Sequence, residues 1–385
     1  MEVRDPIHGF IHLTDYEKKI INSKPFQRLR NIKQLGMTYY IYPSAVHTRF
    51  EHSLGAVFVA NQLFEIIERK FGKYFDKLFG IKDEINLIKR LKMTLRIAAL
   101  LHDVGHSPFS HATEEIFPKG LSHEKIGVEI IRNHLENIFK IREIKRSGIE
   151  LEDVAFLIYP EEVPSIDEEE AKAFHLLREI ISGDIDADRI DYLIRDSYHT
   201  GVIYGKFDYM RLIDTITIVP YIGGGQTEEI SKKIKVEVPE ARIGIEYGGL
   251  HTVEGLLLAR YFMFLQVYFH HVRRIYDLML TDYLKYALPD GKYPSDTSEY
   301  LEYDDIKIVH MLRNSINSGS CKEERILAER IINREHPKRI YETLKPILNF
   351  DEFEQTVRER IEKKFNELHP EIDIYVDYPE KTTFK

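Results

Sequence analysis

The sequence predicts a mainly α-helical protein with one β-rich interruption. Apolar residues recur at helical spacing over most of the chain up to residue 199, and they alternate with polar residues between Thr215 and Gly249. Helical spacing returns after Pro289. With 385 residues, 43% of them hydrophobic and 30% charged, the chain can bury a large core and has the composition of an ordinary globular protein.

The first part of the chain predicts a series of helices. They are expected at about residues 17 to 35, 52 to 71, 84 to 102, 108 to 117, 122 to 140, 150 to 159, 169 to 182 and 186 to 199. Ser107 is expected to cap the fourth of these helices, with Pro108 in its first turn. The free N–H groups at that helix start would favour an anion near His106 and His111.

The alternating region, residues 215–249, predicts a small β-hairpin or meander. The glycine triplet at 223–225 is interpreted as a turn rather than a phosphate loop, because no Lys-Ser/Thr pair follows it. The polar segment 289–299 is the predicted boundary between a core of residues 1–288 and an α+β C-terminal lobe of residues 289–385. That lobe is expected to end in an edge strand at 371–377.

The apolar segment 255–271 predicts a helix in the protein core or at a subunit interface. It is too short for a membrane span, which needs ~20 apolar residues, and it contains Arg260 and Gln266. Arg260, Tyr268 and His270 are expected to face a pocket. Alternatively, Tyr268 is a core residue with a bonded hydroxyl.

Charge and cysteine content exclude several classes of function. A net charge of −9 and a pI near 6.0 argue against sequence-independent binding of nucleic acid. Cys321 is the only cysteine, so no disulfide can form within the chain and a reducing compartment is expected. The N-terminus has no apolar leader segment. We therefore expect a cytoplasmic protein that does not bind membranes.

The dipeptide His102-Asp103 carries the strongest chemical signal. It closes an apolar helical run and is followed by Gly105. Neighbouring residues on a helix point about 100° apart, so a histidine and an aspartate in sequence converge on one ion only where the helix ends. The dipeptide predicts half of a metal site; a capped helix end with a surface charge is the alternative.

More ligands must come from elsewhere, because a vicinal His-Asp pair supplies only two. A histidine-containing segment lies upstream at residues 44–55, and an acidic segment of helical pattern lies downstream at 184–196. An arrangement of the form H…HD…D is the ligand set of the HD-domain metal-dependent phosphohydrolases. The chain resembles this family at three motifs in the family's order.

The resemblance is narrower than the superfamily. Residues 5–9, 26–36 and 49–55 are similar to the deoxynucleotide triphosphohydrolases of the SAM-and-HD-domain type and their bacterial and archaeal dGTPase-like relatives. The similarity runs from Asp5 to about Arg211 and resumes weakly through Arg260 and Tyr268. It does not extend to a SAM domain before Asp5.

The resemblance implies a metal site and a row of catalytic side chains. The implied metal ligands are His52, His102, Asp103 and Asp188. This N2O2 set suits Mn²⁺, Fe²⁺, Ni²⁺, Co²⁺, Zn²⁺ or Mg²⁺ as the divalent cofactor. The residues implied around the phosphates are His106, His111 and His123, with Glu124 or Glu114 orienting a histidine. His111 or His123 would protonate the leaving 5′-oxygen. As alternatives, His123 is an ordinary helix-start histidine and the glutamates are solvated.

Other positions match residues that contact the nucleotide in the family. Arg49, Arg189 and Arg260 are the implied phosphate binders; surface ion pairs are the alternative. The implied deoxyribose contacts are Gln34, Tyr192, Asp196 and Tyr268, which would test the 3′-hydroxyl and crowd the 2′ position.

Two further features bear on the resemblance. Phe264 stands where relatives of this type carry a histidine, which removes one phosphate or leaving-group contact. Arg28, Arg30 and Lys33 resemble a segment that lies near an activating nucleotide site at the subunit interface of the family; a basic helix surface is the alternative.

Three hypotheses follow. The first is a metal-dependent triphosphohydrolase that converts a dNTP to deoxynucleoside and triphosphate by attack of a metal-activated water at the α-phosphorus, and that works as a homodimer or homotetramer. The second keeps the metal site but changes the substrate to another nucleotide phosphoester. The third is a nucleotide-sensing protein without turnover.

Overall fold

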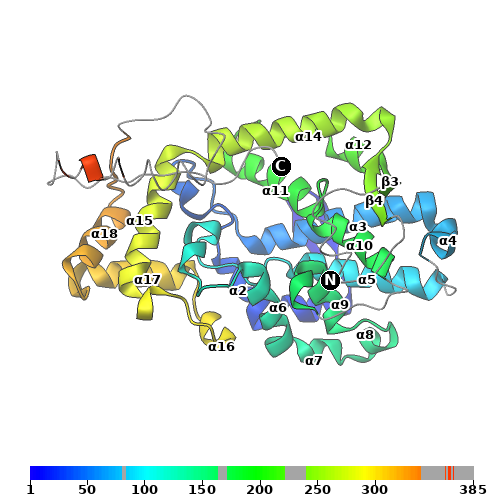
Figure 1. Cartoon of the computed structure of the whole chain (residues 1–385), viewed down its shortest axis with the longest axis horizontal. Coiled ribbons are helices and arrows are strands. Elements are labelled where there is room, and N and C mark those ends of the chain that lie inside the picture. The colour runs from blue at the N-terminus through cyan, green and yellow to red at the C-terminus, as the bar shows by residue number, and fades with distance from the viewer. Residues whose placement is uncertain are drawn as a thin grey trace.

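The computed structural model describes residues 1–79, 84–163, 171–221 and 240–339, together with 360, 363–365 and 367. The glycine triplet 223–225 and the predicted strand 371–377 lie outside these residues. Within them the protein is mainly helical, with two small sheets (Figure 1). The predicted fold class, a mainly α protein with a small β insertion, is confirmed.

The helices of the N-terminal half are α1 (Asp15–Ile21), α2 (Lys24–Arg28), α3 (Arg49–Phe71), α4 (Phe75–Phe79), α5 (Glu84–Leu101), α6 (His123–His134), α7 (Glu136–Phe139), α8 (Arg142–Arg146), α9 (Leu151–Ile158), α10 (Ala171–Ser182) and α11 (Ala187–Thr200). Those that follow are α12 (Tyr209–Asp214), α14 (Leu250–Met263), α15 (His271–Ala287), α16 (Thr297–Tyr300), α17 (Asp305–Ser318) and α18 (Lys322–Ile332).

Two antiparallel hairpins complete the described fold. Strands β3 (Ile216–Tyr221) and β4 (Glu240–Ile245) pair with Ile216 opposite Ile245, within the region for which the sequence predicts a hairpin. Strands β1 (Glu2–Asp5) and β2 (Gly9–His12) form a second hairpin that the sequence pattern did not predict, because four residues are too few to show an alternation.

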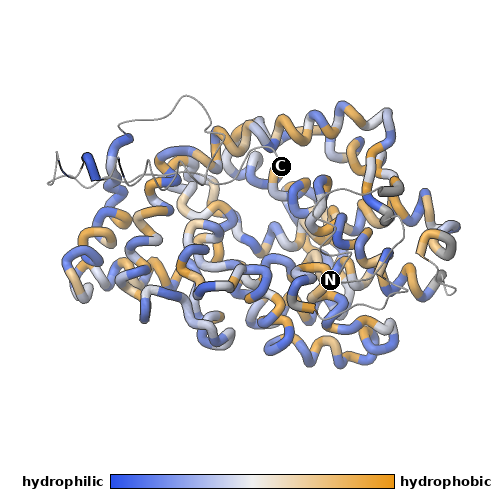
Figure 2. Tube along the Cα trace, in the orientation of Figure 1, coloured by the Kyte–Doolittle hydropathy of each residue, from blue (hydrophilic) through white to orange (hydrophobic). Residues whose placement is uncertain are grey.

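The centre of the fold is α3, which packs against both α5 and α11. Its start is fixed by Glu51, whose carboxylate accepts a hydrogen bond from the backbone N–H of Thr48 at 2.9 Å. Figure 2 shows hydrophobic and hydrophilic residues alternating along most helices, as expected for helices that bury one face. The packing of α3 between α5 and α11 brings together the ends of segments that are far apart in the sequence.

Several predicted helices differ from those observed. The helix expected at 17 to 35 is divided into α1, α2 and a 3₁₀ turn (Leu29–Asn31), and the one expected at 122 to 140 is divided at Leu135. The prediction of a helix that begins at Pro108 is wrong. A 3₁₀ segment, η4 (Ser110–Ile116), begins two residues later, after Phe109 in a left-handed conformation.

The predicted cap at Ser107 is absent for a tertiary reason. The Ser107 hydroxyl donates to the carbonyl of Ser110 at 2.9 Å instead of accepting from a backbone N–H. The N–H of Phe109 donates to the carboxylate of Asp305 at 2.6 Å. The expected anion site at this helix start is therefore replaced by a buried side chain of α17.

The apolar segment at 255–271 is buried on one side only. It forms α14 and one turn of π-helix, η7 (Phe264–Tyr268). Leu256 and Met263 are buried, whereas Leu257 and Leu258 are 44% and 56% exposed. His270 caps the next helix, because its Nδ1 accepts a hydrogen bond from the N–H of Val272 at the start of α15. In the described part of the chain, no helix has the length and apolarity that a membrane crossing requires.

Candidate metal centre

Three helix ends bring four side chains to one place. His102 and Asp103 lie in the turn directly after α5, as the sequence predicted. His52 lies near the start of α3, and Asp188 lies in the first turn of α11, which is capped by Asp186. These four residues are the metal ligands implied by the resemblance, and the structure brings all four together.

The distances describe a compact cluster. His52 Nε2 lies 2.8 Å from Asp188 Oδ1 and 3.6 Å from Asp103 Oδ2. His102 Nε2 lies 3.3 Å from Asp103 Oδ1 and 3.6 Å from Asp188 Oδ1. Two imidazoles and two carboxylates therefore converge at distances that one divalent ion could bridge.

The unpaired atoms fit a metal ion. Nε2 of His52 and Nε2 of His102 are both buried, and neither makes a well-oriented hydrogen bond within the described structure. Nδ1 of His102 contacts the carbonyl of Ala99 at 2.8 Å, which leaves Nε2 as the nitrogen that faces the cluster. Buried polar atoms without partners are rare, and two imidazole nitrogens aimed at carboxylates are explained by a cation between them.

A buried network holds His52 from its other side. Asp191 Oδ2 lies 2.8 Å from His52 Nδ1, and Asp191 Oδ1 lies 2.6 Å from His8 Nε2. Arg195 donates to both oxygens of Asp191 and, through Nη1, to Asp5 at 2.7 Å. The β1–β2 hairpin thus reaches the metal centre through His8 and Asp5.

The sequence alone does not indicate this network. Its only signals were the Asp191-to-Arg195 spacing of four residues, typical of an ion pair on a helix, and the motif at residues 5–9. Metal-bound histidines almost always donate their other N–H to such a partner, so a carboxylate near His52 could have been sought.

Two glycines allow the close packing around the centre. A Cβ on Gly55 would lie 1.9 Å from Asp191 Oδ1, so no other residue leaves room for the Asp191 carboxylate beside α3. A Cβ on Gly105 would lie 2.0 Å from the carbonyl of His123. Gly105 was predicted to end the helix, but α5 already ends at Leu101, and the role of Gly105 is to admit α6.

Asp103 is held by Arg49. Arg49 Nη1 donates to Asp103 Oδ2 at 2.6 Å, and Arg49 Nε donates to the Ser110 hydroxyl at 2.8 Å. The pKa of Asp103 would be raised by burial, but Arg49 and the neighbouring histidines outweigh burial and hold it well below its usual range. Arg49, implied as a phosphate binder, therefore already orients a metal ligand.

The charge balance at His52 favours a cation. Burial alone would lower the pKa of His52, but its contacts with Asp188 and Asp191 outweigh burial and raise the pKa to about 10. In the absence of a metal ion the carboxylates therefore retain a proton on this imidazole. A divalent ion would take the place of that proton.

The other candidate histidines form a second group next to the first. His106 Nε2 lies 3.2 Å from Asp103 Oδ1, and the His106 ring stacks on His123 at 3.9 Å. Glu114 Oε1 lies 2.9 Å from His111 Nδ1 and 2.7 Å from His123 Nδ1. Glu114, and not only Glu124, is thus the carboxylate that orients the histidines; Glu124 lies 3.3 Å from His123 Nε2.

A polar group at the far end of α11 includes the implied sugar contacts. Tyr268 donates its hydroxyl hydrogen bond to Asp196 Oδ2 at 2.7 Å, and His47 Nε2 lies 2.7 Å from Asp196 Oδ1. Tyr192 meets Tyr268 edge to face at 6.1 Å. Gln34 is 9% exposed, and its Oε1 is buried without a hydrogen-bond partner in the described structure. A buried amide oxygen of this kind is available to a hydroxyl of a ligand.

The remaining implied arginines lie in different surroundings. The guanidinium of Arg189 contacts the carbonyl of Asp184 and lies 3.7 Å from Asp186, so it stabilises the start of α11. The guanidinium of Arg260 lies over the ring of Phe264 at 5.0 Å. Phe264, which stands where the resemblance implies a histidine, therefore packs against a residue implied in phosphate binding.

Arg28 and Lys33 do not form a basic helix surface. Arg28 is 5% exposed and donates through Nε to the carbonyl of Tyr303 at 2.7 Å. Lys33 Nζ lies 3.4 Å from Asp305. Both residues join the N-terminal segment to the start of α17, while Arg30 covers the ring of Phe50 at 3.5 Å.

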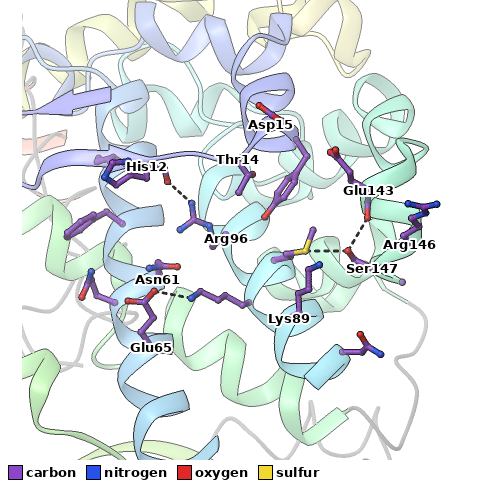
Figure 3. A pocket seen from close by; sticks show the side chains of 18 of the residues that line it. His12, Thr14, Asp15, Asn61, Glu65, Lys89, Arg96, Glu143, Arg146 and Ser147 are labelled. Carbon is purple, nitrogen blue, oxygen red and sulfur yellow. Dashed lines mark hydrogen bonds and ion pairs between the residues drawn. The ribbon is translucent and has the colours of Figure 1, made fainter. Parts of the chain in front are cut away.

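A hollow of about 1140 Å³ lies away from the metal centre, and none of the candidate site residues lines it. Figure 3 shows side chains of α3 and α5 along it, including Asn61, Lys89 and Arg96. Its wall includes Phe58, which stacks on the ring of His8 at 4.7 Å. The hollow is thus separated from the metal ligand His52 by Phe58, His8 and Asp191.

The fold and the cluster define a helical protein with a divalent-metal centre of histidine and aspartate. Residues 49–196 match the family model described as HD domain, and residues 234–384 match the model described as HD associated region. The chain belongs to the HD-domain phosphohydrolase family.

Relatives include proteins with and without a stated activity. An uncharacterized protein of Methanocaldococcus jannaschii is 37% identical over 82% of this chain and 55% of its own length. The human deoxynucleoside triphosphate triphosphohydrolase SAMHD1 is 33% identical over 73% of this chain and 43% of its own length. The chain spans about half the length of the curated relatives it matches.

A solved structure supports the fold. The crystal structure of a hypothetical protein from Aquifex aeolicus matches with a TM-score of 0.67 and 33% identity, over 94% of this chain and 82% of that one.

Proposed function

We propose that this protein hydrolyses deoxynucleoside triphosphates to deoxynucleoside and triphosphate, with a divalent metal ion held by His52, His102, Asp103 and Asp188. The observation that carries the proposal is the convergence of these four ligands beside a row of histidines, on a chain related to a deoxynucleoside triphosphate triphosphohydrolase. A bound divalent ion supplies Lewis acidity and lowers the pKa of a coordinated water.

The histidine row provides the acid–base chemistry. The leaving 5′-oxygen needs a proton, and His111 and His123 both share the Glu114 carboxylate. Burial would raise the pKa of Glu114, but these two imidazoles outweigh it and lower the pKa, so Glu114 stays ionised. An ionised Glu114 keeps the two imidazoles oriented, and we assign His111 or His123 as the proton donor.

His106 has a different role from the other two. Its pKa is held well below the usual range by burial, by Arg49 and by His123. A neutral His106 next to Asp103 can donate a hydrogen bond to a phosphate oxygen or accept one, without adding charge to the centre.

The sugar end of the site is built around Asp196. Its carboxylate is held by Tyr268 and His47, and the phenol of Tyr268 stays protonated because burial and Asp196 raise its pKa well above the ordinary value. We propose that Asp196 and Gln34 bind the 3′-hydroxyl of the sugar. The rings of Tyr192 and Tyr268 are proposed to fill the space next to the 2′ carbon, so that a 2′-hydroxyl does not fit. Arg189 and Arg260 are assigned to the phosphates.

A second candidate function is hydrolysis of another nucleotide phosphoester at the same centre. It is favoured by Phe264, which packs on Arg260 where relatives of the triphosphohydrolase type carry a histidine. A shorter phosphate chain would need fewer contacts at this position.

The experiment that separates these functions is a nucleotide panel assayed with Mn²⁺, Co²⁺, Ni²⁺, Zn²⁺, Fe²⁺ and Mg²⁺, with products separated by ion exchange. The proposal expects deoxynucleoside and tripolyphosphate from a dNTP. Release of orthophosphate or pyrophosphate alone would favour the second function. Absence of turnover with every metal and nucleotide would leave a nucleotide-sensing protein and overturn both.

We also propose that the protein assembles into a homodimer or homotetramer. The side chains of Leu257, Leu258, Phe262 and Leu265 are 41–56% exposed and lie within nine residues of one another. A large exposed apolar patch on a protein surface marks an interaction site. Light scattering coupled to size exclusion would measure the assembly, and a monomer at micromolar concentration would contradict the proposal.

A further inference from the structure

A second group of metal-ligating side chains lies beside the first. His106, His111, Glu114 and His123 each offer one ligand atom, and these four atoms lie within 4.8 Å of one another. We propose that this group, called here the second cluster, binds its own transition-metal ion of the zinc class. The binding claim does not depend on the proposed hydrolysis.

The contacts within the second cluster bring its ligand atoms close to the spacing found around a metal ion. Glu114 Oε1 lies 2.9 Å from His111 Nδ1 and 2.7 Å from His123 Nδ1. Around a tetrahedral zinc ion with bonds of about 2.0–2.1 Å, ligand atoms lie roughly 3.3 Å apart. The two contacts of Glu114 are thus shorter than this spacing by about half an ångström, which small side-chain shifts can supply when an ion binds.

His106 completes the set from the buried side. Its ring stacks on His123, and its Nε2 lies 3.2 Å from Asp103. Its Nδ1 is buried and makes no hydrogen bond within the described residues. A buried imidazole nitrogen without a partner is costly, and one nitrogen of this ring lies within 4.8 Å of the other three ligand atoms.

Local structure explains why these residues converge. His111 and Glu114 lie three residues apart in η4, which bends at Thr113 between them, and Glu114 Oε1 lies 2.9 Å from His111 Nδ1. His123 is the first residue of α6, whose start is fixed by Ser122. The side chains of His111 and Glu114 are 40% and 32% exposed, so an ion can enter from solvent.

The donor set selects the metal. Three imidazoles and one carboxylate form an N3O group, which suits Zn²⁺, Co²⁺ or Ni²⁺, whereas Mg²⁺ and Ca²⁺ require mainly oxygen ligands. The first centre has equal numbers of nitrogen and oxygen donors. The two clusters, which meet at Asp103, are therefore expected to differ in metal preference.

An ion in the second cluster would also change the chemistry next to it. It would occupy the atoms through which Glu114 orients His111 and His123, and so remove the proton donor. If the proposed hydrolysis holds, activity first rises and then falls as Zn²⁺ is added, and the fall is reversed by a mild chelator.

The test is the number of ions bound per chain, measured by titration of the metal-stripped protein with Zn²⁺ and Co²⁺ and by elemental analysis after desalting. We expect two ions for the wild type, one for Glu114→Gln and one for the double variant His102→Ala with Asp103→Ala. The triple variant should bind none. Glu115→Gln is the matched control, because the neighbouring carboxylate of Glu115 is largely exposed and should leave two ions bound.

One ion in the wild type, or two in Glu114→Gln, would overturn the proposal. If a variant fails to fold, the wild type alone decides, because a second equivalent of Co²⁺ in a tetrahedral N3O site adds its own visible absorption. A Co²⁺ absorption spectrum that stops changing after one equivalent would also overturn the proposed second metal site. Stoichiometry is read without turnover, so failure of the hydrolysis proposal and failure of this one are distinguishable.

Discussion

Asp191 Oδ2 contacts Nδ1 of His52 at 2.8 Å, on the side of the imidazole that faces away from the other metal ligands. This contact fixes which nitrogen of His52 points to the centre. The same carboxylate also contacts His8 and Arg195. One buried aspartate therefore connects the N-terminal hairpin, α3 and α11 to a single metal ligand.

Replacement of Asp191 by asparagine should weaken metal binding. The amide cannot accept hydrogen bonds from His52, His8 and Arg195 together, and loss of such an orienting partner typically costs about 10–100-fold in metal affinity. Competition with a chelating dye measures the affinity. Asp290→Asn, at an exposed left-handed position that asparagine tolerates, is the control. Unchanged affinity in Asp191→Asn would show that His52 is oriented by packing alone.

The double replacement of His102 and Asp103 by alanine should remove metal and activity together. Half of the ligand set of the first centre is lost, and the remaining His52 and Asp188 cannot hold an ion alone. Activity and metal content of the first centre are measured on the same sample. The variant His251→Ala, whose side chain is 92% exposed, should keep both. Activity that survives without His102 and Asp103 would disprove the assigned site.

Replacement of Gly55 by alanine should destabilise the protein by about 3 kcal/mol, because overpacking at this site displaces a buried ion-pair network. The new Cβ would lie 1.9 Å from Asp191 and 2.4 Å from Arg195 Nη2. Gly127→Ala in α6 is the matched control, since its nearest neighbour would lie 3.6 Å away and alanine favours the helix. Equal urea midpoints for the two variants would refute the packing argument.

The stability of the protein should fall below pH 6.5 in part through His199. Burial, then His47 stacked on it at 4.3 Å and Arg195, lower the pKa of His199 from 6.5 to about 4. Between these values the unfolded chain binds a proton at this residue that the folded chain does not, so unfolding becomes more favourable as the pH falls. His199→Gln should show a weaker loss of stability between pH 6.5 and 4 in urea titrations. Parallel pH profiles of variant and wild type would contradict this.

Much of the candidate site could be predicted because its signals are local. His102 and Asp103 are adjacent at a helix end, and His52 and Asp188 lie in short motifs. The network behind His52 could not be found in this way, since Asp191 and His8 are 183 positions apart and no periodicity connects them. The proposed roles of the substrate residues and the domain boundary at residue 289 stay predictions.

The errors in the predicted fold have the same origin. Ser107 and Pro108 form a good local helix start, but the carboxylate of Asp305, 196 positions away, takes the N–H of Phe109 and shifts the start to Ser110. For α14, composition predicted burial but could not tell which face the rest of the chain covers.

Asp305 also limits how this fold can be recombined. Its two oxygens accept the backbone N–H groups of Phe109 and Lys33, so a residue beyond the predicted boundary supports the loop that carries His106 and His111. A chimaera that joined residues 1–288 to a relative's C-terminal part without this carboxylate would leave the buried N–H of Phe109 and the partly buried N–H of Lys33 unpaired, at about 1–3 kcal/mol for the buried donor. Residues 1–288 and the segment that carries Asp305 are therefore expected to be replaced only together when this protein is recombined with a relative.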